Sequence, residues 1–278
     1  MSRRLKRNGL IEPSPKNTVL DHKIEDVIVE NKRMTITTYV YEWSIDIFIG
    51  SQTIYCAYAH LSKMAKGAIY HRAFLHKIRW DEECSEPFQH GKDTAMIFNL
   101  IMTYIKKNYP AVTIVEFNDV SNRKCDNGAY VNLAAMKLFT DGQTWYESHF
   151  KAKINDQSES MYRSMLASAN LTKQHMSWDT AKNTMPWSIL EIDEEELKEK
   201  YNSASTWTEW FKWIRTTIGD SAFCIWLSNK GWFDEFQRSV LRFNIMSFIF
   251  QVNVADFDLH YNIKKGGKRK VGTQKKRH

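Results

Sequence analysis

The stretch TAMIFNLIMTYIKKNYPAVTIVEF, residues 94–117, decides the fold. Its first part carries apolar side chains at helical spacing, at Met96, Ile97, Leu100, Ile101, Tyr104 and Ile105. This spacing predicts a helix over 94–108, which Pro110 ends because proline has no N–H to continue the hydrogen bonding. The β-branched run at 112–117 then predicts a strand.

Strand patterns precede this helix. Residues 34–43 alternate β-branched and aromatic side chains, and residues 44–58 repeat the pattern around a Gly50-Ser51 turn. Another short strand is expected at 75–80. Because a strand, a helix and a strand in succession indicate a crossover unit in a mixed sheet, we expect an α/β (α+β) domain over residues 26–155.

The segment that follows this domain changes character. Residues 156–205 are expected to form a helical or irregular connector. Within it, Asp193 is placed to cap a helix, with Glu196 as its capping-box partner. The acidic run that follows Asp193 is expected to be a solvated helix face.

Aromatic residues dominate the C-terminal part, and residues 206–262 are expected to form a smaller aromatic-rich helical domain. One helical stripe comprises Trp207, Trp210, Phe211 and Ile214. Gly219 is placed to end that helix, and a second helix is expected over 233–250. Such a stripe is typical of a core. Aromatic surface beyond what a small core can bury predicts a partner-facing patch at Trp207, Trp210 and Trp213.

The basic residues gather at the two ends of the chain. The net charge is +7, from 39 Lys and Arg against 32 Asp and Glu. Twelve of the basic residues are Arg3, Arg4, Lys6, Arg7, Lys264, Lys265, Lys268, Arg269, Lys270, Lys275, Lys276 and Arg277. We therefore expect a basic extended arm over 1–25 and a basic tail over 263–278. Such tails contact nucleic acid, a nuclear import receptor or an acidic protein surface, or they solubilise the chain.

The cysteine pattern and hydropathy predict an intracellular protein. Cys56, Cys84, Cys125 and Cys224 are widely spaced and form no CxxC pair, which predicts free thiols in a reducing compartment. No apolar run is long enough to span a membrane, and no apolar stretch follows the basic N-terminus as in a signal peptide.

The loop FQHGKDTAM, residues 88–96, is the strongest candidate for a ligand site. It opens the predicted helix, so its backbone N–H groups are placed to hold a phosphate at the positive end of the helix dipole. The alternative is an ordinary turn capped by Asp93 or Thr94. A single glycine and an aspartate within the loop favour the turn.

Two further groups of residues give weaker signals. His60, His71 and His76 are not at recurrent ligand spacing, so no metal site is predicted. A thiol–imidazole pair of Cys125 with His149 would be reactive, but nothing in the sequence brings the two together.

A carboxylate pair of Asp119 with Glu147 is likewise conceivable, although their separation cannot be read from the sequence. The neighbouring Trp145 and Tyr146 are expected to be packing anchors.

The strand at 75–80, the loop at 90–95, the helix and the strand at 112–117 together resemble the cofactor-binding half of the GNAT acetyltransferase fold. Residues 132–135 and 146–150 are similar to that family's closing helix and aromatic end. In the family, the loop amides hold the pyrophosphate of acetyl-CoA, and a tyrosine near the closing helix often acts as general acid.

The resemblance implies cofactor binding at Gly91, Lys92 and Thr94, with Tyr146 as the acid. The motif is degenerate here. Asp93 stands where a second glycine is expected, and His149 stands where glycine usually precedes the phenylalanine.

A second resemblance concerns the string DGQTWYESHF, residues 141–150, together with residues 119–125. It is similar to a segment shared by uncharacterised proteins of nucleocytoplasmic large DNA viruses, the giant viruses among them. The GGKRK sequence at 266–270 also resembles the basic tails of their virion proteins. This implies a minor capsid or virion-associated protein, located in the virion and in the host cytoplasm or nucleus.

These patterns together predict a structural protein of the virion. It would hold capsid partners through the aromatic C-terminal region and the basic tails, without a cofactor. Two alternatives stay open: a GNAT-type N-acetyltransferase that uses acetyl-CoA, and a non-specific nucleic-acid-binding protein that acts through its tails.

Overall fold

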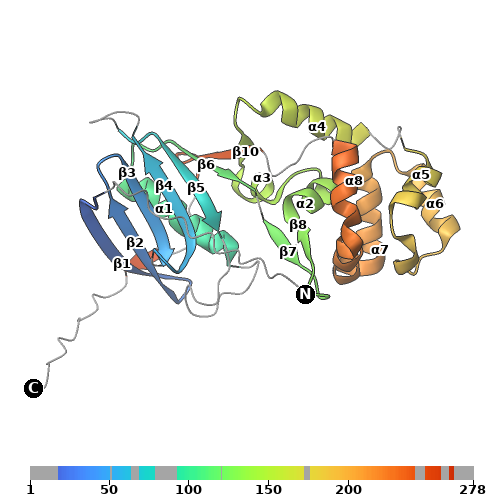
Figure 1. Cartoon of the computed structure of the whole chain (residues 1–278), viewed down its shortest axis with the longest axis horizontal. Coiled ribbons are helices and arrows are strands. Elements are labelled where there is room, and N and C mark those ends of the chain that lie inside the picture. Colours follow the sequence, from blue (N-terminus) through green and yellow to red (C-terminus); the bar gives the residue numbers. More distant parts are fainter. Residues whose placement is uncertain are drawn as a thin grey trace, which may run out of the picture. The chain divides into compact units, whose positions relative to one another are not determined.

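The computed structural model describes residues 18–50, 52–63, 69–78, 93–119, 121–171, 176–241, 248–257 and 263–265. The chain is of the α+β class, as predicted, with a mixed sheet, helices and an aromatic-rich helical region (Figure 1). It divides into two compact units. Unit 1 comprises residues 1–73, 77–111 and 259–278, and unit 2 comprises residues 74–76 and 112–258. The predicted 26–155 region therefore contributes residues to both units.

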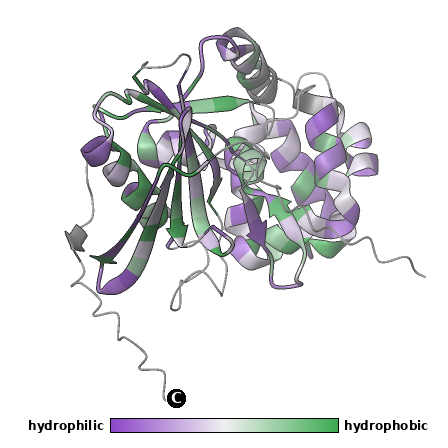
Figure 2. Cartoon of the chain, turned by 60° about the vertical axis from the view of Figure 1, so that its left-hand side comes forward, coloured by the Kyte–Doolittle hydropathy of each residue, from purple (hydrophilic) through white to green (hydrophobic). Residues whose placement is uncertain are grey.

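The strands of unit 1 follow one another along the chain. β1 (Asp21–Val29), β2 (Lys32–Val40), β3 (Ser44–Gly50) and β4 (Tyr55–Ser62) form antiparallel neighbours. β5 (Arg72–Ile78) is shared, because its residues 74–76 belong to unit 2. β-branched and aromatic residues favour these strands because alternate side chains face the core. Figure 2 shows apolar residues running along the strands.

Gly50 is required where β3 ends. Its φ is 117°, and a Cβ at this position would lie 2.5 Å from the carbonyl oxygen of Ile54. Only glycine fits this close approach of two backbone segments, which explains the turn signal in the sequence.

α1 (Thr94–Asn108) has the bounds that the apolar spacing predicts. Its apolar side is buried and it packs against β4. The Tyr104 hydroxyl donates to Glu25 Oε2 over 3.0 Å and lies 3.0 Å from Thr38 Oγ1. Polar bonds therefore add to the apolar contacts that fix α1 on the sheet.

Both predicted terminal segments contribute to the sheet of unit 1. β1 begins at Asp21, so the end of the predicted 1–25 arm is a strand. β11 (Ile263–Lys265) pairs antiparallel with Val27–Val29 of β1, so the start of the predicted tail is a strand too.

Unit 2 has its own strands. β6 (Ile114–Asn118) confirms the predicted strand and pairs with β10 (Ile249–Asn253), which also pairs with β9 (Lys153–Ile154). β7 (Asn122–Lys124) and β8 (Tyr130–Asn132) form a hairpin.

The predicted helix over 233–250 is wrong in its second part. α8 comprises Trp232–Leu241, residues 242–247 lie outside the described residues, and Phe250 lies in β10. The pairing partners of β10 are distant in sequence, and local periodicity does not report them.

The remaining helices of unit 2 are α2 (Leu133–Asp141), α3 (Trp145–Phe150), α4 (Glu159–Leu171), α5 (Trp178–Thr184), η2 (Trp187–Ile189), α6 (Glu194–Ser203), α7 (Trp207–Ser228) and η3 (Asn229–Gly231). Side-chain caps start several of them. The Asp193 carboxylate accepts from the N–H groups of Glu195 and Glu196, which confirms the predicted cap of α6.

Aromatic side chains of α7 form the core of the helical region. Trp207, Trp210, Phe211 and Ile214 are all 0% exposed. Gly219, which the sequence predicted to end this helix, interrupts it with φ 81° and ψ 163°, and α7 continues to Ser228. Among the described residues, no helix is both long and apolar enough to cross a membrane.

Candidate partner-binding groove

The predicted cofactor loop is described only at its end. Gly91 and Lys92 lie outside the described residues, and Thr94 is the first residue of α1. Asp93 occupies the cap position, but its side chain makes no capping bond. Its Oδ2 accepts from Lys32 Nζ over 2.6 Å. The positive charge of Lys32 beside the start of α1 is therefore compensated by Asp93 and not by a bound anion.

Tyr146, the predicted acid, is buried. It is 7% exposed, and its ring lies 4.7 Å from that of Phe117 and 4.9 Å from that of Trp145. Burial and, to a lesser degree, the Asp119 carboxylate raise the pKa of Tyr146 well above its usual range. A phenol so enclosed has the geometry of a packing residue.

The fold brings Asp119 close to Glu147, which the sequence could not show. Asp119 is 0% exposed, and its Oδ1 accepts from the N–H of Ser121 over 3.2 Å and from the Ser121 hydroxyl. Its Oδ2 has no hydrogen-bond partner among the described residues. Burial raises the pKa of Asp119 to about 6, and the Glu147 charge adds to this.

One carboxylate oxygen of Glu147 accepts two structural hydrogen bonds. Its Oε2 accepts from the Thr144 N–H and from the Tyr162 hydroxyl, both over 2.7 Å. The bond from Tyr162 to Glu147 therefore helps to join α4 to α3. Because Asp119 is inaccessible, its pair with Glu147 is no substrate site.

His60 pairs with a carboxylate that sequence reasoning missed. Its Nδ1 lies 2.7 Å from Asp46 Oδ1, and Tyr58 donates to the same oxygen over 3.1 Å. Asp46 and His60 face each other across the β3–β4 register, so only the strand pairing reveals them. Within the described ranges, no group of three or more His, Cys, Asp and Glu residues is arranged to hold a metal ion.

The prediction of free thiols is wrong. Cys125 and Cys224 form a disulfide with a Cα–Cα distance of 5.5 Å, across a sequence separation of 99 residues. Cys56 is disulfide-bonded as well. The wide spacing that suggested free thiols carries no information about which cysteines the fold brings together. The bond also excludes a reactive pair of Cys125 with His149.

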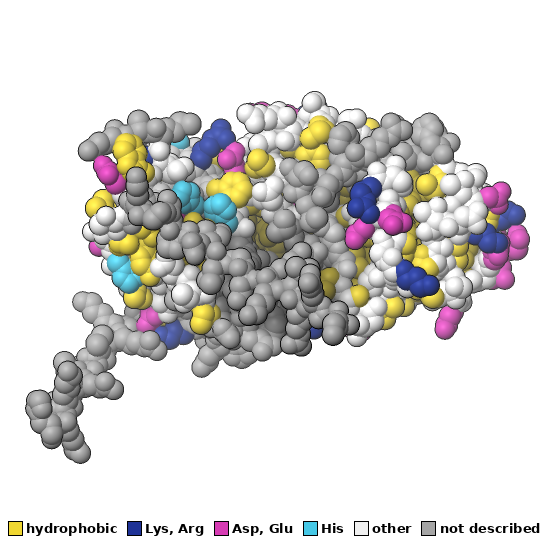
Figure 3. Space-filling model, in the orientation of Figure 1, with side chains coloured by type: hydrophobic (Ala, Val, Ile, Leu, Met, Phe, Trp, Pro, Cys, Tyr) yellow, Lys and Arg dark blue, Asp and Glu magenta, His cyan; other side chains and the backbone are white. Residues whose placement is uncertain are grey.

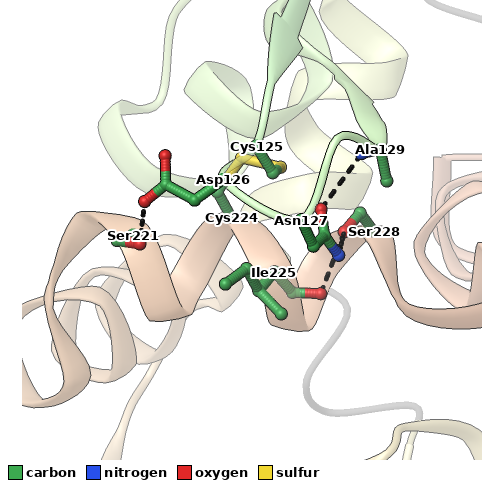
Figure 4. Close-up of a disulfide and its surroundings, with 8 residues drawn as sticks. All are labelled: Cys125, Asp126, Asn127, Ala129, Ser221, Cys224, Ile225 and Ser228. Atoms are coloured by element: carbon green, nitrogen blue, oxygen red, sulfur yellow. Dashed lines mark hydrogen bonds between the residues drawn. A yellow bond between two sulfur atoms is a disulfide. The ribbon is translucent and has the colours of Figure 1, made fainter.

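The Cys125–Cys224 disulfide joins the β7–β8 hairpin to α7 (Figure 4). Both cysteines are buried. Hydrogen bonds flank the bond on each side: Ser221 donates to Asp126, and Asn127 donates to Ser228 Oγ over 3.2 Å. The hairpin is therefore held along one side of the second half of α7.

The predicted partner-contact residues fall into three groups. Trp207 and Trp210 are 0% exposed and offer no surface to a partner. Trp213 is half-buried. The basic residues Lys268, Arg269, Lys270, Lys275, Lys276 and Arg277 lie outside the described residues.

An apolar groove opens elsewhere in the helical region, along α5, η2 and α6. Its volume is about 400 Å³, and it is lined by Trp178, Lys182, Asn183, Met185, Pro186, Trp187, Ser188, Ile192, Glu194 and Leu197. Three of these side chains are buried and form the floor: Trp178, Met185 and Leu197. We call this the α5–α6 groove.

The Trp187 indole is fixed in the groove. Its Nε1 donates to the Lys182 carbonyl over 2.9 Å, and its ring lies 5.2 Å from Trp178 and 5.2 Å from the buried Trp210. Ile189, in the same 3-10 turn, is 43% exposed. A rigid aromatic wall beside an exposed aliphatic residue is the composition of a protein contact site.

The elements that form the α5–α6 groove are acidic overall, although the two charged residues in its lining, Lys182 and Glu194, pair with each other. Residues 178–203 expose seven carboxylates, namely Asp179, Glu191, Asp193, Glu194, Glu195, Glu196 and Glu199. They expose three lysines, Lys182, Lys198 and Lys200, so the net charge of the segment is −4. Figure 3 shows charged side chains gathered where α5 and α6 lie.

The sequence contained a partial signal for this groove. It placed tryptophans in the region and an acidic run on α6, but the acidic run was interpreted as a solvated face alone. What it could not show is that α5, η2 and α6 fold around one apolar depression.

No protein-family model, no curated protein and no solved structure matches this chain.

Proposed function

We propose that this protein is a structural component of the particles of a large DNA virus, a minor capsid or virion-associated protein that holds a partner protein in the α5–α6 groove. The observation that carries the proposal is the groove itself, a depression open to solvent in which Trp178 and Trp187 lie among apolar and polar side chains. Apolar surface rimmed by polar residues marks sites of protein contact.

The disulfides support the particle as the location. Bonds such as Cys125–Cys224 form and persist in oxidising surroundings, and virion surfaces are among these. In a particle outside the host cell, a disulfide would stabilise the folded protein by restricting its unfolded state. We therefore propose the virion as its destination, after synthesis in the host cytoplasm.

The acetyltransferase alternative receives no comparable support. Tyr146 is 7% exposed within an aromatic cluster, and a general acid has to reach the proton acceptor on its substrate.

The test is incorporation into particles. Ile192→Glu places a charge in the wall of the groove, where the native side chain is half-buried. Met161→Glu on α4 is the control for an added charge, because Met161 does not line the groove; at 39% exposed it is more exposed than the half-buried Ile192. We expect Ile192→Glu to lower incorporation about tenfold relative to the control, as loss of an interface anchor does.

The amount per particle is measured by quantitative mass spectrometry of purified virions, with near-ultraviolet circular dichroism of each variant to check folding. Absence of the native protein from purified particles would overturn the proposal. Equal incorporation of Ile192→Glu and Met161→Glu would show that the groove is not the site that binds the partner in the particle.

A further inference from the structure

We propose that the occupant of the α5–α6 groove is the basic N-terminal segment, residues 1–12, of a second copy of this chain. The inference rests on the proposed function, since it names the partner of the same groove. Exchange of N-terminal segments would link copies of the protein to one another within the particle.

The first requirement is an apolar anchor. The groove floor and walls are formed by Trp178, Trp187, Ile192 and Leu197, so a bound segment must insert aliphatic side chains to replace the water there. The N-terminal segment carries Leu5, Leu10 and Ile11. The C-terminal residues 266–278 are more basic but contain a single aliphatic residue, Val271.

The second requirement is positive charge. The elements that line the groove carry a net charge of −4. Residues 3–7 carry four positive charges, at Arg3, Arg4, Lys6 and Arg7, and no acid occurs before Glu12. Charges of opposite sign across an interface speed association and fix the orientation of the bound segment.

The third requirement is reach. With residues 1–12 in the groove, the five residues 13–17 that connect them to Thr18, where the described chain begins, span up to about 20 Å when extended. The contact therefore requires that Thr18 of one copy lies within this distance of the groove of its neighbour.

The binding mode follows from the groove's construction. The indole of Trp187 is held by its bond to the Lys182 carbonyl, so little side-chain entropy is lost there on binding. Lys182 itself forms an ion pair with Glu194 across the rim. An arginine from the segment would compete for Glu194, since guanidinium binds carboxylates in a bidentate manner.

The experiment uses two full-length variants that each lack one half of the contact. The groove variant is Ile192→Glu. The segment variant combines Leu10→Glu with Ile11→Glu. Self-association is measured by sedimentation equilibrium from about 1 to 200 μM, a range that detects micromolar contacts. The native chain is expected to self-associate, and each variant alone is expected to weaken this at least about tenfold.

The decisive sample is an equimolar mixture of the two variants. The native segment of the groove variant can then enter the native groove of the segment variant. Association should therefore return, but only as dimers of one chain of each kind. Met161→Glu and Val271→Glu serve as controls and should associate like the native chain. Raising the salt concentration should weaken the native association.

Three outcomes would overturn the inference. A native chain that stays monomeric across the range excludes a second copy as the occupant. Failure of the mixture to associate, when each variant is folded, excludes exchange between copies and points to a segment bound within its own chain or to another partner. Loss of association with Val271→Glu would assign the contact to the C-terminal tail.

These results are separable from the proposed function. If the segment variant still enters particles while Ile192→Glu does not, the groove binds a different virion protein and the structural role stands.

Discussion

At the scale of single residues, the molecule contains a buried carboxylate that works against its own stability. Asp119 is 0% exposed, and only one of its oxygens is hydrogen-bonded within the described chain. Burial removes the carboxylate from water and so disfavours its charged form, which raises the pKa of Asp119 to about 6. Because of this raised pKa, the free energy of unfolding should depend on pH in the mildly acidic range.

The first prediction concerns this linkage. Because the folded state binds the Asp119 proton more tightly than the unfolded chain, stability should fall as the pH rises from about 4 to about 6 and stay lowered above that. Asp119→Asn removes the effect and keeps the acceptor for Ser121. We expect the variant to gain up to about 3 kcal/mol over the native chain at pH 7.

The measurement is urea unfolding of both proteins between pH 4 and 7. The difference between the two curves isolates Asp119, since all other groups titrate alike in both. A constant difference across this pH range would contradict a shifted carboxyl at this position.

The second prediction compares two glycines with positive φ. Gly50→Ala must place a Cβ 2.5 Å from the Ile54 carbonyl, whereas a Cβ at Gly219 has no atom within 4 Å. Both substitutions cost about 1 kcal/mol or more for the backbone conformation alone. We expect Gly50→Ala to be clearly more destabilising. The two free energies of unfolding, measured in urea, decide this, and equal values would mean that the β3–β4 connection relaxes.

At the scale of elements, the disulfide and the caps define how unit 2 is held together. Caps such as Asp193 on α6 are local and were readable from the sequence. The strand β10 was not, because the apolar run at 248–252 suits a helix and a strand equally, and β6 and β9 decide between them.

The third prediction tests the tie between the hairpin and α7. Replacing both Cys125 and Cys224 by alanine should lower stability by about 3–5 kcal/mol, since the bond closes a long loop. In non-reducing buffer this variant keeps the Cys56 disulfide, so reduction of the native chain should cost more than the double substitution does. Thermal unfolding in both buffers gives the comparison. A melting temperature unchanged by the double substitution would show that the Cys125–Cys224 bond does not stabilise the folded protein.

At the scale of the whole molecule, the two ends of the chain meet in one unit. β11 pairs with β1, so the sheet of unit 1 is complete only once residues 263–265 have been synthesised. On its other edge, β1 pairs with β2.

The fourth prediction follows from this pairing. Truncation after Asn262 removes β11 and should increase hydrogen exchange of the β1 amides that face β11, such as that of Ile28, whereas the amides of Val27 and Val29 face β2. Truncation after Lys265 keeps β11 and should leave the exchange of Ile28 unchanged. Amide exchange by mass spectrometry distinguishes the two. Equal protection in both truncations would mean that β11 contributes nothing to the edge of the sheet.

The sequence by itself determined the α+β class, the bounds of α1, the turn at Gly50, the cap of α6 and the break at Gly219. Each of these depends on residues within a few positions of one another, where periodicity and backbone preference decide. Tertiary structure alone decided the disulfide pairing, the strand β10, the burial of Trp207 and Trp210, the meeting of Asp119 with Glu147, and the α5–α6 groove. These features join residues far apart in the chain or depend on how separate elements pack. Local periodicity and backbone preference do not report such contacts, because their free energy depends on which distant residues the fold brings together.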